Sequence, residues 1–347
     1  MTEYAWFAAL CDDDYEFLGV PDPALRSSWS HCRDIVLAAE RNGFDNVLLP
    51  SGYALGIDAT AFASAIAIET SRIKLLLAVR LGELVVPQLA RQIATLQQIA
   101  GGRLVINAIS SDLPGETVSS EDRYRRTTES IAVLRTLLRG ERANFDGQFV
   151  TAHVDAPRIA VDSPHDPVVY FGGLSEAARE CAAESCDVYL MWPDTTQQMT
   201  GVMREMDARA ARFGRTLRYG WRSHVIVRES EDEARAAASR LLSRLDADTG
   251  AAIRTKSLDL KSAGVARQSE LRESADSDGY IERHLWAGVG RARSGAGIAI
   301  VGDPDQVAGK LREIRDAGVD TFILSGYPHL AECDLVARHV LPRLRTR

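Results

Sequence analysis

Polar side chains of the kinds that bind anions and move protons follow apolar segments in this chain. The segment FILSGYPHL (322–330) passes from apolar residues directly into Tyr327 and His329. In RSHVIV (222–227), Arg222 and His224 are two positions apart, so an extended strand presents both on one side. Arginine binds anions, while histidine and tyrosine exchange protons. Together these side chains are typical of a catalytic or anion-binding site.

A second motif indicates a phosphate site. In FGGLSEAARE (171–180), Gly172 and Gly173 permit close approach of a ligand to the backbone. Ser175 stands at the start of a predicted helix, whose free N–H groups attract anions. Tyr124, near the start of another predicted helix, is placed to hydrogen-bond the same phosphate. An ordinary capped turn has the same pattern, so these residues alone leave both interpretations open.

The elements that position these groups recur along the chain as apolar segments followed by stretches of helical spacing. Continuous rather than alternating apolar segments are typical of parallel strands covered on both faces. Eight such units predict one (β/α)₈ barrel domain over 1–347. No GxGxxG motif follows the first segment, which argues against an open dinucleotide-binding sheet. The predicted strands are 5–10, 46–50, 74–80, 103–110, 167–173, 187–192, 219–227 and 321–326.

In such barrels the chemistry lies at the carboxyl ends of the strands. Besides the residues above, those ends carry Ser51, Arg80, Asn107 and Trp192. They offer no pair of carboxylates for glycoside hydrolysis, no obvious metal-ligand set and no GxSxG nucleophile. Metal-dependent and acyl-transfer chemistry are therefore not expected.

One connection is much longer than the others. About 90 residues separate the predicted strands 219–227 and 321–326, and helices at 231–246 and 304–318 account for only part of them. We expect the segment 247–300 to be an insertion that closes over the site as a lid, since long loops are rarely without a role. Its part GVGRARSGAG (288–297) places Arg291 and Arg293 among glycines, as in an anion-closing loop. A disordered surface loop remains the alternative.

Charge and composition limit the partners and the compartment. A formal charge of −7 gives no reason to expect nucleic acid or an anionic membrane. No window approaches the roughly 18 apolar residues of a membrane span, and the N-terminus lacks the basic region of a signal peptide. The five cysteines are odd in number and lack paired metal-binding spacing. We expect a cytoplasmic protein with reduced thiols.

Six segments together resemble a known family. They are ERNGFDNVLLPSG (40–52), YFGG (170–173), RSHVIVRES (222–230), HLWAGVG (284–290), GAGIAIVGD (295–303) and SGYPHL (325–330). This pattern is similar to that of the alkanesulfonate monooxygenases, members of the bacterial luciferase-like superfamily. The resemblance implies a (β/α)₈ barrel with a lid between strands seven and eight. It also implies a two-component enzyme, in which a separate NAD(P)H:flavin reductase supplies reduced FMN. Oxygen then forms a peroxyflavin that oxidises a small organic substrate, releasing sulfite from sulfonates.

The resemblance also assigns roles to residues by motif position. It implies a homodimer or homotetramer, for which the helix at 85–102 could supply a contact, and it implies no metal. The expected substrate and catalytic group is Arg222, His224, Tyr327, Arg293 and Trp192. The expected flavin contacts are Ser51, Asn107, Tyr124, Gly173 and Ser175.

The chain departs from the family in ways that leave the substrate open. The sulfonate oxidisers have a cysteine after strand two, where this chain has SGYALGID (51–58) with Leu55 nearest that position. Acids follow the first and third strands, namely Asp12, Asp13, Asp14 and Glu83. They are either a solvated rim or partners of an amine-bearing substrate. A non-sulfonate substrate, a deazaflavin-dependent hydride transfer and flavin binding without turnover therefore remain alternatives.

Overall fold

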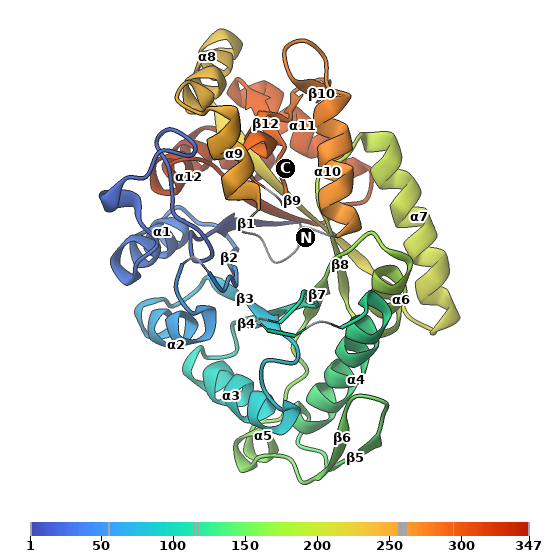
Figure 1. The fold of residues 1–347 in the computed structure, drawn as a ribbon. Helices are drawn as coiled ribbons and strands as arrows, with labels where there is room; N and C mark the ends of the chain where they lie inside the picture. The colour runs from blue at the N-terminus through green and yellow to red at the C-terminus, as the bar shows by residue number, and fades with distance from the viewer. Residues whose placement is uncertain are drawn as a thin grey trace.

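Largely buried strands form the centre of the protein in this computed structural model (Figure 1). Residues 2–345 are described, apart from 55, 114, 117, 256–261 and 294, so Leu55 lies outside the described residues. The central parallel strands are β1 Glu3–Phe7, β2 Asn46–Leu49, β3 Lys74–Arg80, β4 Leu104–Ile109, β7 Val169–Phe171, β8 Val188–Met191, β9 Arg218–Val227 and β13 Thr321–Ser325.

These eight strands of the described chain close into a barrel. Each is hydrogen-bonded in parallel to the next in the order given, and β13 pairs with β1, with Tyr4 opposite Phe322. The predicted (β/α)₈ barrel is confirmed. The first strand was predicted at 5–10, whereas β1 is Glu3–Phe7, so the prediction lies too far along the chain. Beyond Phe7 the backbone turns, because the amide of Leu10 bonds to the carbonyl of Ala8.

The strands are apolar on both faces, as parallel sheets require. One set of side chains packs inside the barrel, and the other packs against the surrounding helices. The inside set consists of Ala5, Phe7, Leu48, Leu76, Val105, Tyr170, Val188 and Ile323. Since side chains alternate along a strand, this set also identifies which polar residues at the strand ends face inward.

Helices surround the barrel, and several of them begin at a residue whose side chain caps the first turn. Ser28, Ser119 and Ser175 each accept a hydrogen bond from a backbone amide in the first turn of their helix. The helices are α1 Trp29–Arg41, α2 Ala59–Glu69, α3 Val86–Ile99, α4 Ser120–Leu138, α5 Arg158–Asp162, α6 Glu176–Ser185, α7 Thr196–Arg212, α8 Glu231–Leu242, α11 Pro304–Asp316, α12 His329–His339 and α13 Leu341–Arg345, with a 3₁₀ turn η1 at Pro23–Leu25.

A hairpin between α4 and α5 was not predicted from the sequence. It consists of β5 Ala143–Asp146 paired antiparallel with β6 Thr151–Val154. The buried carboxylate of Glu129, on α4, accepts the backbone N–H groups of the residues from Gln148 to Val150 at the tip. This long-range contact stabilises the hairpin, and no local pattern in the sequence predicts it.

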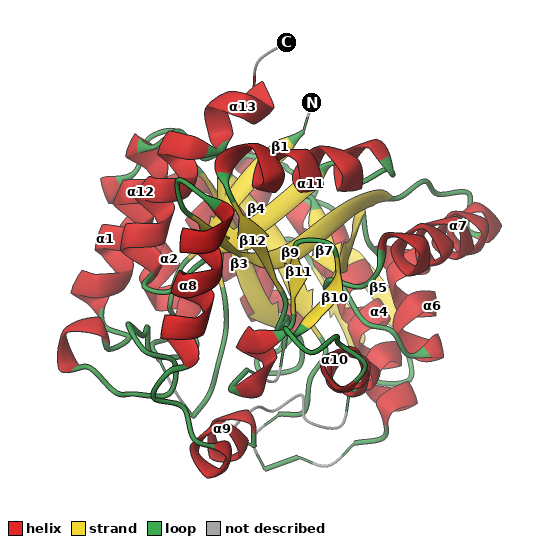
Figure 2. Ribbon diagram, turned by 90° about the horizontal axis from the view of Figure 1, so that it is seen from above, coloured by secondary structure: helices red, strands yellow, loops and turns green. Residues whose placement is uncertain are grey.

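The described part of the 247–300 insertion has regular structure and is not a structureless loop. It contains α9 Ala247–Arg254, α10 Ala263–Glu273, β10 Tyr280–Glu282, β11 Leu285–Trp286 and the 3₁₀ turn η2 Gly288–Arg291. The following strand, β12 Ala299–Gly302, pairs in parallel with β9 from His224 to Val227, whereas β13 pairs with β9 from Gly220 to His224. Figure 2 shows α9 and α10 at the end of the barrel opposite the two termini, which is the end where the parallel strands finish.

Within the part of the chain that the structure describes, no helix has the length and apolar character needed to cross a bilayer.

Candidate active site

Arg222 and His224 face the barrel interior at the carboxyl end of β9. Arg222 is opposite Ile323 and His224 is opposite Ser325 in the register with β13, and Ile323 belongs to the inside set. Both side chains are buried. The expectation that the two residues share one side of the strand is therefore correct.

His224 is held between β13 and the turn that follows it. Its Nδ1 lies 2.8 Å from the hydroxyl oxygen of Ser325, and its ring stacks on Tyr327 with centroids 5.3 Å apart. Next to it, the guanidinium of Arg222 lies 4.4 Å from the ring centre of Phe7 and donates to the carbonyl oxygen of Ser223. Stacking on an aromatic ring keeps this buried cation in place with its remaining N–H groups available.

Burial sets the protonation states of this group. Burial and the nearby Arg222 cation lower the pKa of His224 well below its ordinary value, so the imidazole is neutral at pH 7. Burial raises the pKa of Tyr327, which stays protonated. Burial also lowers the pKa of Arg222 to about 9, which still leaves it a cation at neutral pH. The site thus combines a cation, a proton acceptor and a proton donor.

Arg293 reaches this group from the insertion. It follows η2 and forms an ion pair with Asp12, on the loop after β1. Burial alone would lower the pKa of Arg293, but attraction to Tyr327 and Asp12 outweighs it and the pKa is raised. Arg222, His224, Tyr327 and Arg293 therefore lie close together, as the resemblance implies.

A cavity of about 250 Å³ lies at the ends of β4, β7 and β8. It is lined by four of the five predicted flavin contacts and by Trp192, whose indole packs near Gly264 of α10. These four are Asn107, Tyr124, Gly173 and Ser175. Trp192 was expected in the substrate and catalytic group, but the structure places it beside the residues expected to contact the flavin. Ser51, partly buried after β2, does not line this cavity.

The cavity residues fit a flavin phosphate. A Cβ on Gly173 would lie 2.7 Å from the Cβ of Ala178 and 3.7 Å from the hydroxyl oxygen of Tyr124, so the glycine leaves a space at the start of α6. Ser175 caps that helix through the amide of Ala178. The hydroxyl oxygen of Ser111, which also lines the cavity, is buried and has no hydrogen-bond partner among the described residues. A phosphate would supply that partner.

The four acids near the barrel mouth have partners inside the protein. Asp12 is paired with Arg293, and Asp13 accepts the backbone N–H of Ser27. Glu83 lies 2.9 Å from Nε of Arg80, whose side chain is buried. The idea of a solvated acidic rim is therefore wrong for Asp12, and it is also wrong for Asp14, which is fully buried. Asp13 is partly exposed and Glu83 is exposed, so these two carboxylates still face the barrel mouth.

The comparison with known proteins agrees with this geometry. The sequence profile of the luciferase-like monooxygenases matches residues 17–321. The chain belongs to this family. It is 61% identical to the sulfoquinovose monooxygenase of Novosphingobium aromaticivorans, over 99% of this chain and 96% of that protein. It is 47% identical to the sulfoquinovose monooxygenase of Agrobacterium fabrum, over 99% of this chain and 90% of that protein.

A solved structure shares the fold of this monooxygenase at low identity. Riboflavin lyase (RcaE), determined with modified FMN and riboflavin, superposes with a TM-score of 0.78 at 16% identity, covering 99% of this chain and 91% of that chain. The broader luciferase-like family expected from the sequence is confirmed. The relatives named here are sulfoquinovose monooxygenases rather than alkanesulfonate monooxygenases.

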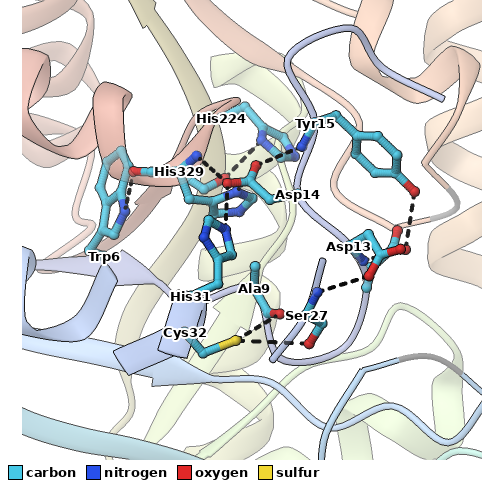
Figure 3. A network of polar contacts seen from close by, with 12 residues as sticks. Trp6, Ala9, Asp13, Asp14, Tyr15, Ser27, His31, Cys32, His224 and His329 are labelled. Atoms are coloured by element: carbon cyan, nitrogen blue, oxygen red, sulfur yellow. Dashed lines mark hydrogen bonds and ion pairs between the residues drawn. The ribbon is translucent and has the colours of Figure 1, made fainter. Parts of the chain in front are cut away.

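The sequence did not reveal one part of this monooxygenase's site. Asp14 lies between His31 on α1 and His329 on α12 (Figure 3). Its Oδ2 is 3.0 Å from Nε2 of His31, and its Oδ1 is 2.7 Å from Nδ1 of His329. Among the described residues, no three His, Cys, Asp or Glu side chains are arranged to hold a metal ion. This is therefore a hydrogen-bonded network. Its members come from three distant segments, so no spacing in the sequence could identify it.

Proposed function

We propose that this monooxygenase uses reduced FMN and oxygen to release sulfite from a sugar sulfonate of the sulfoquinovose type. The observation that carries the proposal is the buried guanidinium of Arg222 together with the largely buried guanidinium of Arg293, beside a neutral His224 and a protonated Tyr327. Two cations in a buried site suit a sulfonate, which has three oxygens and a permanent charge. The names of two full-length relatives support a sugar sulfonate over a simple alkanesulfonate.

The overall reaction would insert one oxygen atom at the carbon that bears sulfur and reduce the other to water. The C–S bond breaks, the carbon becomes an aldehyde and the sulfonate leaves as sulfite, while reduced FMN supplies two electrons and two hydrogens. Bound reduced flavin would supply the activation of oxygen. Arg222 and Arg293 would hold the sulfonate, which would then share Arg293 with Asp12. His224 would accept a proton and Tyr327 would donate one.

Flavin binding would use the cavity at the ends of β4, β7 and β8. Gly173, Ser175 and Tyr124 would hold the phosphate, while Asn107 and Trp192 would line the remainder of the cavity. Ser51, outside the cavity, would contact the flavin from the end of β2. The insertion 247–300 would act as a lid that excludes water, because Arg293 and α10 both reach the strand ends.

The proposal extends to partners and compartment. A separate NAD(P)H:flavin reductase would deliver reduced FMN in the cytoplasm, where NAD(P)H is available. A homodimer or homotetramer would form with a contribution from residues 85–102, within which Ile99 is exposed.

A sulfite assay tests this function. The protein is mixed with an FMN reductase, NADH, FMN and air, together with sulfoquinovose, hexanesulfonate or taurine. We expect sulfite above the reductase-only control with sulfoquinovose, and much less with the other two. Arg222→Met should abolish it, whereas Arg158→Met, at an arginine side chain that is 92% exposed, should not. Sulfite from hexanesulfonate alone would refute the sugar substrate, and turnover under nitrogen would indicate hydride transfer instead.

A further inference from the structure

His329 has one ring nitrogen in a dense hydrogen-bond network and the other with no partner. The ring is 2% exposed, and its Nδ1 lies 2.7 Å from Oδ1 of Asp14. Its Nε2 is buried and has no hydrogen-bond partner among the described residues. A buried nitrogen without a partner is costly unless a further group meets it.

The carboxylate of Asp14 determines where the protons of the two imidazoles lie. Oδ1 accepts the backbone N–H of Tyr15 at 2.9 Å, and Oδ2 accepts the backbone N–H of His329 at 2.8 Å. Burial alone would raise the pKa of Asp14, but attraction to His329 and hydrogen bonds from both histidines lower it, so the carboxylate is ionised. An ionised carboxylate only accepts hydrogen bonds. Nδ1 of His329 and Nε2 of His31 must therefore each carry a hydrogen.

It follows that the neutral form of the His329 ring has its lone pair on Nε2. The His329 ring packs against two aromatic rings at the barrel mouth. The ring of Tyr327 is perpendicular to it with centroids 5.0 Å apart, and the ring of Phe7 is 5.6 Å away. The backbone of the same residue is fixed, since its carbonyl accepts the indole N–H of Trp6.

We propose that His329 is a proton-holding residue of the active site, and that Asp14 and His31 are positioning residues that fix its tautomer. Nε2 takes up a proton that the chemistry delivers on the Tyr327 side, and Nδ1 keeps its own, so His329 becomes an imidazolium. The Asp14 carboxylate is its counter-ion. When Tyr327 gives a proton to the reacting group, Nε2–H replaces it and His329 returns to the neutral form. This role rests on the proposed desulfonation.

The other ionisable groups around His329 are compatible with this role. His224 is neutral, and a charge on His329 is among the causes that lower the pKa of His224, so the two imidazoles are not protonated together. Glu332, in the first turn of α12, is paired with Arg228 through two hydrogen bonds. Tyr15, whose backbone N–H donates to Asp14, stays protonated because burial raises its pKa.

Histidine NMR tests the tautomer without flavin or substrate. The chain has seven histidines, so ¹⁵N-histidine labelling gives a simple spectrum in which His329→Asn identifies one set of signals. At pH 8 we expect a hydrogen on Nδ1 and none on Nε2 of His329. In Asp14→Asn that preference should be lost, while Asp13→Asn, a neighbouring substitution, should leave it unchanged. A hydrogen on Nε2 in the wild type would overturn the proposal.

Kinetics of the same variants test the role in the reaction. Asparagine at position 329 can still donate to Asp14 but has no titratable nitrogen, so His329→Asn separates structure from proton transfer. We expect kcat for sulfite release to fall about 100-fold in His329→Asn and about 10-fold in Asp14→Asn. The KM for the sulfonate should stay within about twofold, because neither residue is proposed to bind the sulfonate. The pH profile of Asp14→Asn should also be displaced relative to that of Asp13→Asn.

Each outcome decides one of the two proposals. A folded His329→Asn variant with wild-type kcat would reject the proton-holding role. If the wild type releases sulfite from none of the sulfonates, the proposed function fails, while the NMR spectra still decide the tautomer. His31→Gln should lower kcat only about threefold, because it leaves the Asp14–His329 contact in place.

Discussion

The carboxylate of Asp12 is ion-paired with the guanidinium of Arg293, although 281 positions separate the two residues in the chain. Both side chains are largely buried. The pair joins the loop after β1 to the insertion between β9 and β13. This ion pair also lies near Tyr327. Asp12 therefore helps to hold Arg293 over the site.

Replacing Asp12 should loosen the insertion. In Asp12→Asn the buried Arg293 loses its counter-ion, and we expect the free energy of unfolding to fall by about 2 kcal/mol. Limited proteolysis should cleave within 247–300 faster than in the wild type. Asp278→Asn is the control in the same insertion, because Asp278 is 72% exposed and 3.8 Å from Arg235. The free energy of unfolding of this control variant should fall by less than about 1 kcal/mol. Equal cleavage rates in both variants would show that the ion pair does not hold the insertion.

His224 should not titrate in the neutral range. Its pKa is lowered first by burial and then by the Arg222 cation, so the imidazole stays neutral as the pH rises from 6 to 8. We therefore expect the pH profile of kcat/KM for His224→Asn to be lower than that of the wild type but parallel to it in this range. If a wild-type inflection between pH 6 and 8 disappeared in the variant, His224 would be the titrating group and this assignment would be wrong.

Gly173 should be essential for binding the phosphate of FMN. In Gly173→Ala the new methyl group would crowd Ala178 and fill space beside the Tyr124 hydroxyl. We expect the Kd for FMN to rise about tenfold, or about 1.4 kcal/mol, and the Kd for riboflavin to change less. Fluorescence quenching of each flavin gives both constants. Gly309→Ala, on α11 with no atom within 4 Å of the new Cβ, is the matched control and should change neither. Equal losses for FMN and riboflavin would place the phosphate elsewhere.

The sequence alone predicted the barrel and the group around β9 and β13. Continuous apolar segments followed by helical spacing identify parallel strands, and strand alternation puts Arg222 and His224 on one side. These are local properties, so they can be read without knowing the fold. The resemblance added Arg293, which the structure brings near Tyr327 from a distant segment of the chain.

The three consecutive acids after β1 show what the sequence alone does not predict. Asp12, Asp13 and Asp14 are consecutive, and the sequence treats them alike. The structure gives Asp12 an arginine, Asp13 a backbone amide and Asp14 two histidines. The difference arises because the loop after β1 turns sharply, so successive side chains meet the insertion, the start of α1 and the start of α12.

The sequence by itself therefore determined the fold class, the strand ends that carry polar groups and the chemical types available there. Only the tertiary structure decided which of those groups meet, which are buried and which are charged. Protonation depends on desolvation and on charges brought close from distant segments, as for Asp14 between His31 and His329. Those contacts exist only after the barrel has closed and the insertion has packed against it, because closure brings residues 14, 31 and 329 to one place.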